Sequence, residues 1–270
     1  MVEVHGDIGE RDRARVLLVI PTLGRRIGTL NQTLLSVSTQ RANGTVAADL
    51  VVVTPPAAVE ARRLAAKVGA RIVDDPGGLG AAINAGLACA SATHEYGNWL
   101  SDDDLLTPGS LETTIAALDA APTAAGAFGH CDYIDELGAR LFTGRAGRLA
   151  PWLMRWGPNL VPQPGALFRL DAVRAVGGVD PSLSYAMDLD LLLRLRKRGR
   201  LVDTQRTVAA FRWHDESTTV ANRSLSLAEA EQVKRRHLPP ALRPVAPLWE
   251  APVRSASRLA AARVTAMARH

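Results

Sequence analysis

Short apolar runs recur through the first hundred residues and predict the strands of a buried sheet. Each run is continuous instead of alternating, which is typical of strands that are covered on both faces. The stretches between the runs carry apolar residues on one side and predict helices. The predicted strands are 15–21, 49–54, 70–74 and 95–100, and the predicted helices are 29–40, 57–68 and 81–90. This alternation predicts an α/β fold with a doubly wound, mostly parallel sheet.

The second half of the sequence is less regular and predicts a smaller region attached to this sheet. Its predicted elements are a strand pair at 127–141 that turns at 135–138, a strand at 166–168, and helices at 171–176 and 188–197. The aromatic stretch at 152–157 is interpreted either as a lid or as packing.

The last residues of the chain are rich in proline, alanine and arginine. Five prolines between 239 and 252 predict a stiff connector, and residues 255–269 predict a short helix. Arg254 and Arg258 fall on the opposite side of this helix from Val264 and Met267. The pattern predicts either peripheral contact with an anionic membrane or packing on the rest of the chain or on a second copy.

Charge is concentrated in the same region. From Lys234 onward there are eight basic residues and one acid, a net charge of +7, which leaves −2 for the remainder of a chain whose total is +5. The pI near 9.7 therefore describes the tail. Because no groove-reading module spreads these cations over a surface, nucleic acid is not expected as a partner.

Composition indicates a cytoplasmic protein. An apolar fraction of 47% is ordinary for a soluble domain, and no apolar run approaches the roughly 18 residues that span a bilayer. The N-terminus lacks the basic-then-apolar order of a signal peptide. Two cysteines, Cys89 and Cys131, supply neither a disulfide framework nor a zinc site.

Three consecutive carboxylates, Asp102, Asp103 and Asp104, follow the predicted strand 95–100. Adjacent carboxylates repel one another, so they favour a bound cation, and Mg²⁺ or Mn²⁺ suits oxygen ligands that are shared with substrate phosphates. Ligands of doubly wound sheets bind beyond the carboxyl ends of the strands, where this triplet is expected. An N-cap cluster for the helix that begins near Pro108 is the alternative.

Six motifs, in order along the chain, resemble one known family. They are Val19-Ile-Pro-Thr22, Ala82-Ile-Asn-Ala-Gly-Leu87, Leu100-Ser-Asp-Asp-Asp-Leu-Leu106, Val176-Gly-Gly-Val-Asp180, Met187-Asp-Leu-Asp-Leu-Leu-Leu-Arg-Leu195 and Phe211-Arg-Trp-His214. Together they resemble the inverting family 2 of glycosyltransferases, which has the A-type nucleotide-sugar fold. The resemblance covers roughly residues 16–219.

The resemblance implies a Mg²⁺ or Mn²⁺ site at the triplet. Asp103 is the implied metal ligand, Asp102 or Asp104 assists it or contacts the ribose, and His214 lies near the metal and diphosphate. Ser101 stands where the family has its first aspartate, which leaves the division of roles among the three open. Such an ion offsets the charge that develops on the leaving diphosphate.

The resemblance also implies a catalytic base. Asp188, at the start of the helix 188–197, matches the family's base, and Asp190 is the rival. Met187 replaces the acid that usually precedes the base. An N-cap role is the structural alternative for Asp188.

Further residues match the donor and acceptor regions of the family. On the donor side these are Pro21, Thr22, Arg25, Asp75, Gly78, Asn84 and Asp102, and on the acceptor side Gln163 and Trp152. Thr54-Pro55-Pro56 replaces the family's usual acidic turn after the second strand, so the base of the donor nucleotide stays open.

The resulting hypothesis is a metal-dependent inverting glycosyltransferase that moves a sugar from a nucleoside-diphosphate sugar to a hydroxyl acceptor. It divides the chain into a polar leader (1–14), a nucleotide-sugar-binding half (15–125), an acceptor and base half (126–222) and a C-terminal extension (223–270). The alternatives are a non-catalytic nucleotide- or glycan-binding protein and a nucleotidyltransferase. The expected location is the cytoplasm, with possible association at the cytoplasmic membrane face through the extension.

Overall fold

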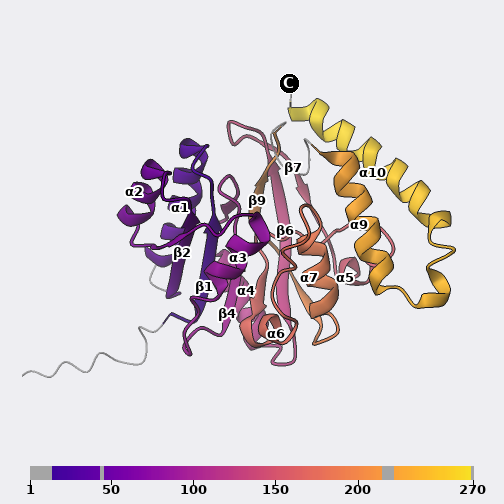
Figure 1. The fold of residues 1–270 in the computed structure, drawn as a ribbon, viewed down its shortest axis with the longest axis horizontal. Helices are drawn as coiled ribbons and strands as arrows, with labels where there is room; N and C mark the ends of the chain where they lie inside the picture. The colour runs from indigo at the N-terminus through magenta and orange to yellow at the C-terminus, as the bar shows by residue number, and fades with distance from the viewer. Residues whose placement is uncertain (1–13, 43–45, 215–221, 269–270) are drawn as a thin grey trace, which may run out of the picture.

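A mixed sheet forms the centre of the fold (Figure 1). The computed structural model describes residues 14–42, 46–214 and 222–268. Within these residues the sheet has nine strands in the order β3-β2-β1-β4-β8-β6-β9-β5, with β7 paired to β6. The strands are β1 (Val16–Pro21), β2 (Ala48–Thr54), β3 (Arg71–Asp74), β4 (Tyr96–Trp99), β5 (Leu105–Leu106), β6 (Gly126–Ile134), β7 (Arg140–Gly144), β8 (Leu167–Arg169) and β9 (Leu201–Arg212).

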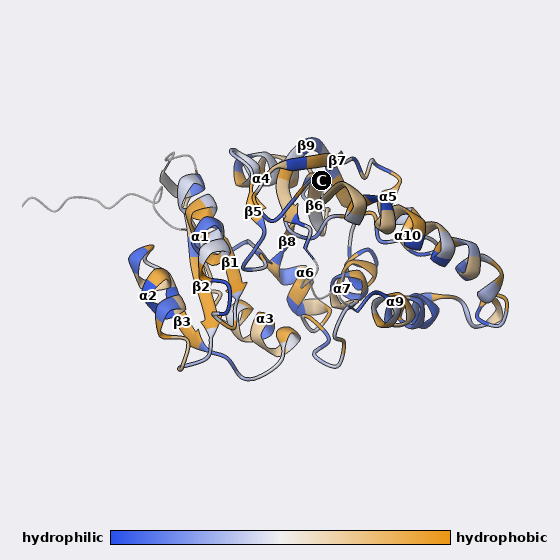
Figure 2. Ribbon diagram, turned by 90° about the horizontal axis from the view of Figure 1, so that it is seen from above, coloured by the Kyte–Doolittle hydropathy of each residue, from blue (hydrophilic) through white to orange (hydrophobic). Residues whose placement is uncertain are grey.

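The first half of the sheet is parallel, and the predicted α/β fold is confirmed. Strand β1 pairs in parallel with both β2 and β4, and β2 pairs in parallel with β3. The connecting helices are α1 (Ile27–Ala42), α2 (Val59–Lys67) and α3 (Leu79–Leu87). In Figure 2, α1 and α2 lie on one side of the apolar strands β1 and β2, and α3 lies on the other.

Burial on both faces explains the continuous apolar runs. Along β1, Val16, Leu18 and Ile20 pack in one core with α1 and α2, whereas Leu17 and Val19 pack in a second core with α3. Alternate residues thus serve opposite faces, as the pleat of a strand requires. Helix α3 approaches β1 so closely that a Cβ on Gly86 would lie 2.2 Å from Cγ1 of Val19.

The second half of the sheet is largely antiparallel. Strand β8 joins β4 to β6, and β6 pairs in parallel with the long strand β9. The predicted hairpin is present as β6 and β7. The helices of this half are α4 (Ser110–Asp119), α5 (Ala150–Leu153), α6 (Leu170–Ala175) and α7 (Met187–Leu195). Strand β9 was not predicted, because the polar run 203–207 interrupts its apolar pattern.

Two helices follow β9 in the described part of the chain, and their extent differs from the prediction. Helix α9 (Arg223–His237) packs on α7, and α10 (Pro247–Ala268) runs along α9 (Figure 1); the 3₁₀ turn η2 (Pro240–Leu242) lies between them. The predicted connector was wrong beyond residue 246. Pro247 occupies the first helical position, where its missing N–H costs nothing, and the helix continues through Pro252. No described helix combines the length and apolar character needed to cross a bilayer.

Candidate active site

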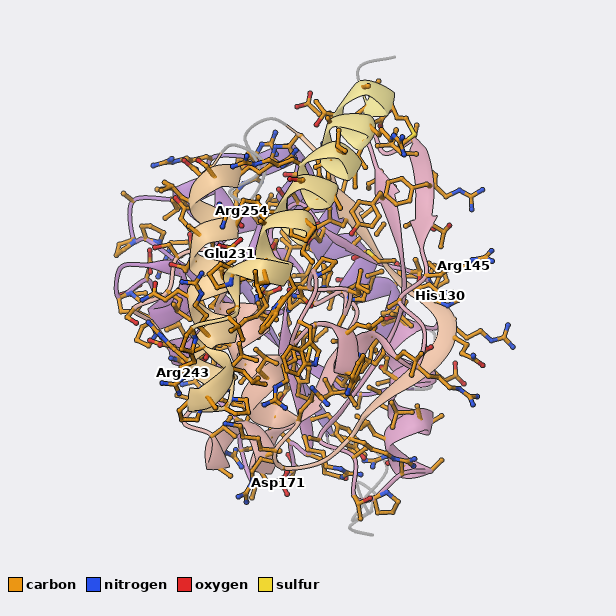
Figure 3. The ribbon with its side chains drawn as sticks, turned by 90° about the vertical axis from the view of Figure 1, so that its right-hand side faces the viewer. His130, Arg145, Asp171, Glu231, Arg243 and Arg254 are labelled. Carbon is orange, nitrogen blue, oxygen red and sulfur yellow. The ribbon has the colours of Figure 1, made fainter. Side chains whose placement is uncertain are left out.

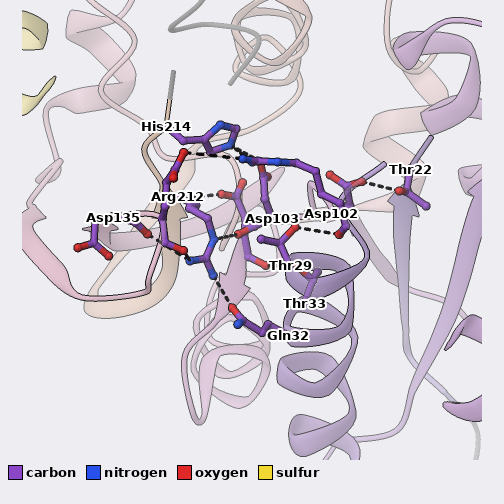
Figure 4. A network of polar contacts seen from close by, with 12 residues as sticks. Thr22, Thr29, Gln32, Thr33, Asp102, Asp103, Asp135, Arg212 and His214 are labelled. Carbon is purple, nitrogen blue, oxygen red and sulfur yellow. Dashed lines mark hydrogen bonds and ion pairs between the residues drawn. The ribbon is translucent and has the colours of Figure 1, made fainter. Parts of the chain in front are cut away.

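The acidic triplet lies at the carboxyl end of β4, beside the loop that follows β1 (Figure 4). The Asp102 carboxylate accepts a hydrogen bond from the Thr22 hydroxyl, so the segments that leave these neighbouring strands are joined. Burial raises the pKa of the Asp102 carboxyl, the Thr22 hydrogen bond opposes this rise, and the charge of Asp103 adds to it. This edge is where open α/β sheets bind ligands.

Asp103 and His214 form the polar centre of the site. His214 follows β9 and is buried, and its Nε2 lies 2.7 Å from Oδ2 of Asp103. Nη1 of Arg26, from the loop between β1 and α1, lies 2.5 Å from the same Nε2 and 3.6 Å from Oδ2 of Asp103. An imidazole nitrogen either donates or accepts, so Nε2 satisfies one of these two neighbours at a time.

The third carboxylate, Asp104, is turned into the fold. Its side chain is buried, and its Oδ1 accepts the backbone N–H of Arg212 at 3.0 Å. The buried Arg212 side chain donates to the carbonyl of Asp103 at 3.1 Å and to Oε1 of Gln32 at 2.7 Å (Figure 4). Burial and then the charge of Asp103 raise the pKa of the Asp104 carboxyl well above its usual range. Asp104 thus ties β9 to the end of β4.

Among the described residues, no three His, Cys, Asp or Glu side chains are grouped as a complete metal site. The Asp103–His214 pair nevertheless offers one carboxylate oxygen and one imidazole nitrogen. Mn²⁺ accepts both kinds of ligand, and Mg²⁺ favours the oxygen. Such ions take their remaining ligands from water and from substrate phosphates. The pair therefore fits a divalent ion whose coordination shell is completed by a bound diphosphate.

Asp188 lies in the first turn of α7 and is half-buried. Its Oδ2 accepts a hydrogen bond from Nδ2 of Asn159 at 2.9 Å. Burial raises the pKa of the Asp188 carboxyl to about 6, because it outweighs the opposing hydrogen bonds from backbone N–H groups at the helix start and from Asn159. A carboxylate that titrates near neutrality is suited to accept a proton from a substrate.

The rival carboxylate, Asp190, is fully engaged within the protein. Its Oδ2 lies 2.7 Å from Nε of Arg194, and its Oδ1 lies 3.1 Å from Nε2 of His237. Burial tends to raise the pKa of Asp190, but the hydrogen bond from His237 and the charge of Arg194 bring it below the usual value. Asp190 thus joins α7 to α9.

The donor-side residues are placed in three different ways. Pro21 and Thr22 lie at the carboxyl end of β1 beside Asp102, and Arg25 is exposed. Asp75 accepts the N–H of Gly77 at 2.9 Å and so caps the loop ahead of α3. The structure thus joins Thr22 to Asp102, whereas the Arg25 side chain is exposed to solvent.

The glycine loop ahead of α3 is followed by an asparagine that holds another loop. Gly78 has a φ of 87°, a conformation that suits glycine. Asn84 donates to the carbonyl of Val179 at 2.8 Å and accepts its N–H at 2.9 Å, and so fixes the loop ahead of α7.

The two acceptor-side residues also differ. Gln163 is buried and donates to Oδ1 of Asn98 at 2.9 Å and to the carbonyl of Trp99 at 2.7 Å, so it supports the end of β4. Trp152 on α5 is 57% exposed and is free to meet a ligand from solution. Ser217 and Thr218 follow His214 in the sequence and are candidates for a loop that closes over the diphosphate or for a plain turn; both lie outside the described residues.

Three residues that the sequence did not single out contribute to these sites. Arg26 contacts His214 and Asp103, and Arg212 anchors the triplet. Glu229, on the unpredicted helix α9, accepts the backbone N–H groups that precede α7. Arg25 beside Arg26, and the motif Phe211-Arg-Trp-His214 around Arg212, carried weak signals for the first two, but nothing in the local sequence pointed to Glu229.

Solved structures share this fold. The mannosyltransferase PcManGT from Pyrobaculum calidifontis, solved with GDP-Man and Mn²⁺, matches with a TM-score of 0.62 and 19% identity over 93% of this chain and 76% of that one. S. aureus TarS 1–349, solved with UDP-GlcNAc, matches with a TM-score of 0.61 and 12% identity over 83% of this chain and 65% of that one. The match spans 42% of a longer TarS chain. No protein-family model and no curated protein matches the sequence.

These likenesses establish the fold as the A-type nucleotide-sugar fold of glycosyltransferases, as the sequence motifs predicted. In this chain the acidic triplet follows β4, at the carboxyl edge of the parallel half of the sheet.

Proposed function

We propose that the chain is a metal-dependent inverting glycosyltransferase that moves a sugar from a nucleoside-diphosphate sugar to a hydroxyl acceptor. The observation that carries the proposal is the Asp103–His214 pair at the end of β4, in a fold whose solved neighbours hold nucleotide sugars. In this proposal residues 15–125 bind the donor, and residues 126–222 supply the acceptor side and the base.

Asp103 and His214 are the groups that hold the divalent ion. When bound, that ion stabilises the negative charge that develops on the leaving diphosphate. The Arg26 guanidinium lies beside the Asp103–His214 pair and supplies a second positive charge near the leaving diphosphate. In this proposal Asp102, which is hydrogen-bonded to Thr22, is the carboxylate that contacts the ribose of the donor. Asp104 and Arg212 keep the triplet in place beneath these groups.

Asp188 is the base in this proposal. Its carboxylate takes the proton of the acceptor hydroxyl as the acceptor oxygen bonds to the anomeric carbon, and the bond from that carbon to the diphosphate oxygen breaks. A single displacement of this kind inverts the anomeric configuration. The pKa of about 6 keeps Asp188 mostly unprotonated at neutral pH while leaving it basic enough to take a proton. The ion pairs of Asp190 make it the weaker candidate.

Calorimetry with UDP, GDP and dTDP tests the donor site and its metal dependence. We expect at least one diphosphate to bind in the presence of Mn²⁺ or Mg²⁺ and to bind much more weakly in EDTA. Equal affinity with and without EDTA would contradict the metal dependence, and no binding of any diphosphate would contradict the proposed function. Turnover of the matching nucleotide sugar would separate an enzyme from a binding protein.

A further inference from the structure

Glu229, near the middle of α9, binds the chain segment that leads directly into α7. Its carboxylate accepts the backbone N–H of Ser184 at 3.0 Å, of Tyr185 at 2.5 Å and of Ala186 at 2.7 Å. Helix α7 begins at the next residue, Met187, and Asp188 follows it. Three backbone donors on one carboxylate fix the path of the chain within two residues of the proposed base.

A second contact from α9 holds the chain segment that contains Asn159, the hydrogen-bond donor to Asp188. The buried Lys234 side chain donates from Nζ to the carbonyl of Gly157 at 3.2 Å. Two residues further on, Asn159 donates to Asp188 at 2.9 Å. One helix thus holds both segments that meet at the base.

We infer that α9 positions the catalytic base and that Glu229 is its positioning residue, an inference that rests on the proposed role of Asp188. The carboxylate acts in two ways. It fixes the start of α7, and its negative charge adds to the larger effect of burial in disfavouring a negative charge on Asp188. The next carboxylate on α7, Asp190, is paired with Arg194 and His237.

The test compares Glu229→Gln with Glu231→Gln, a matched control on the same helix. Glu231 forms an ion pair with Arg254 of α10, with contacts of 2.8 and 2.6 Å (Figure 3). The control therefore loses a carboxylate of α9 that binds α10 and not the segment ahead of α7. The readouts are donor affinity by calorimetry and the pH profile of donor hydrolysis, with UDP-GlcNAc or GDP-Man as donor and water as the hydroxyl acceptor.

For Glu229→Gln we expect donor affinity to stay unchanged and kcat to fall by roughly 10- to 100-fold, since a small misplacement of a catalytic group is enough for such a loss. The acidic limb of the pH profile should move to lower pH, because the removal of a nearby negative charge lowers the pKa of a carboxyl group. Glu231→Gln should have the same kcat as the wild type, and the acidic limb of its pH profile should lie at the same pH. A kcat for Glu229→Gln within about twofold of the control, or an unmoved limb, would overturn the inference.

Glu229→Asp keeps the charge and shortens the reach, and it decides the question if Glu229→Gln does not fold. We expect it to lower kcat without moving the limb, and wild-type kcat in this variant would overturn the inference. Asp188→Asn distinguishes a failure of the proposed base from a failure of the positioning role of Glu229. If that variant remains active, the proposed base is wrong; if it is inactive while Glu229 substitutions have no effect, the positioning role alone fails.

Discussion

Nε2 of His214 lies 2.7 Å from Oδ2 of Asp103, although 111 positions of sequence separate the two residues. The contact exists because β9 runs beside β5 and returns its end to the carboxyl edge of the sheet. The pair joins the acidic triplet to a histidine from the last strand, and it defines the place where a cation and a diphosphate are expected to meet.

Asp103→Asn should abolish the effect of Mn²⁺ on diphosphate binding, because it removes the carboxylate charge beside His214. Asp104→Asn is the matched control, since the Asp104 oxygen is bound to the backbone of Arg212. Calorimetry with and without EDTA should show metal-dependent binding in the control and not in Asp103→Asn. The reverse pattern would mean that Asp104 is the ligand.

Turnover should rise with pH through about 6. Burial raises the pKa of Asp188 to about this value, and the base accepts a proton only when it is unprotonated. A profile of kcat against pH measures the limb directly. A limb near the usual aspartate value of 3.8 would contradict the raised pKa of Asp188, and a limb that persists in Asp188→Asn would show that another group is the titrating base.

The same pKa has a consequence for stability. Because the pKa is higher in the folded protein than in the unfolded chain, the stabilising contribution of this group is present below pH 3.8 and is lost as pH rises through about 6. Asp188→Asn removes the titrating carboxyl group and with it this pH-dependent loss of stability. Thermal unfolding should therefore show a smaller decrease in Tm from acidic to neutral pH in the variant, and an unchanged decrease would contradict the shift.

Asp190→Asn should act mainly on stability. It weakens the contacts of a buried carboxylate to Arg194 and His237, and hydrogen bonds to a charged group contribute about 2 kcal/mol each. We expect a lower free energy of unfolding in denaturant and a kcat close to that of the folded wild type. A loss of kcat of about 10²-fold or more without a loss of stability would make Asp190 the base.

The basic residues of helix α10 should not bind the protein to anionic membranes. Its Arg254 is paired with Glu231, and its buried Glu250 is paired with Arg235, so part of the basic charge is already used within the protein. We expect flotation with anionic vesicles to equal flotation with neutral ones. Flotation with anionic vesicles alone that is lost when the exposed Arg258 and Arg263 are replaced by serine would contradict this and support the membrane hypothesis.

Local patterns were sufficient to predict the parallel half of the sheet. Continuous apolar runs and helical stretches placed β1 to β4 and the helices between them, because both faces of these strands are buried. The same patterns placed the triplet at a strand end. The apolar pattern does not predict β9, because polar residues at 203–207 interrupt it. It also does not predict the full extent of α10, because Pro247 and Pro252, residues that commonly end helices, lie within that helix.

The partners of the site were less predictable than its motifs. Sequence favoured Arg25, but the neighbouring Arg26 lies at Asp103 and His214, since the direction of a loop side chain depends on the tertiary fold. Glu229 lies more than forty residues beyond the segment that it binds, with the separations to Ser184, Tyr185 and Ala186 being 45, 44 and 43 positions. Contacts of this kind leave no periodic signal in the chain.

The most direct test of the account measures sugar transfer by the wild type and by Asp188→Asn. With UDP-GlcNAc or GDP-Man and Mn²⁺, release of the nucleoside diphosphate is followed together with the anomeric configuration of the product by NMR. The account predicts inversion by the wild type and a decrease in kcat of roughly 10²–10⁴-fold in Asp188→Asn, with donor affinity retained. Retention of configuration, or wild-type turnover by Asp188→Asn, would contradict it.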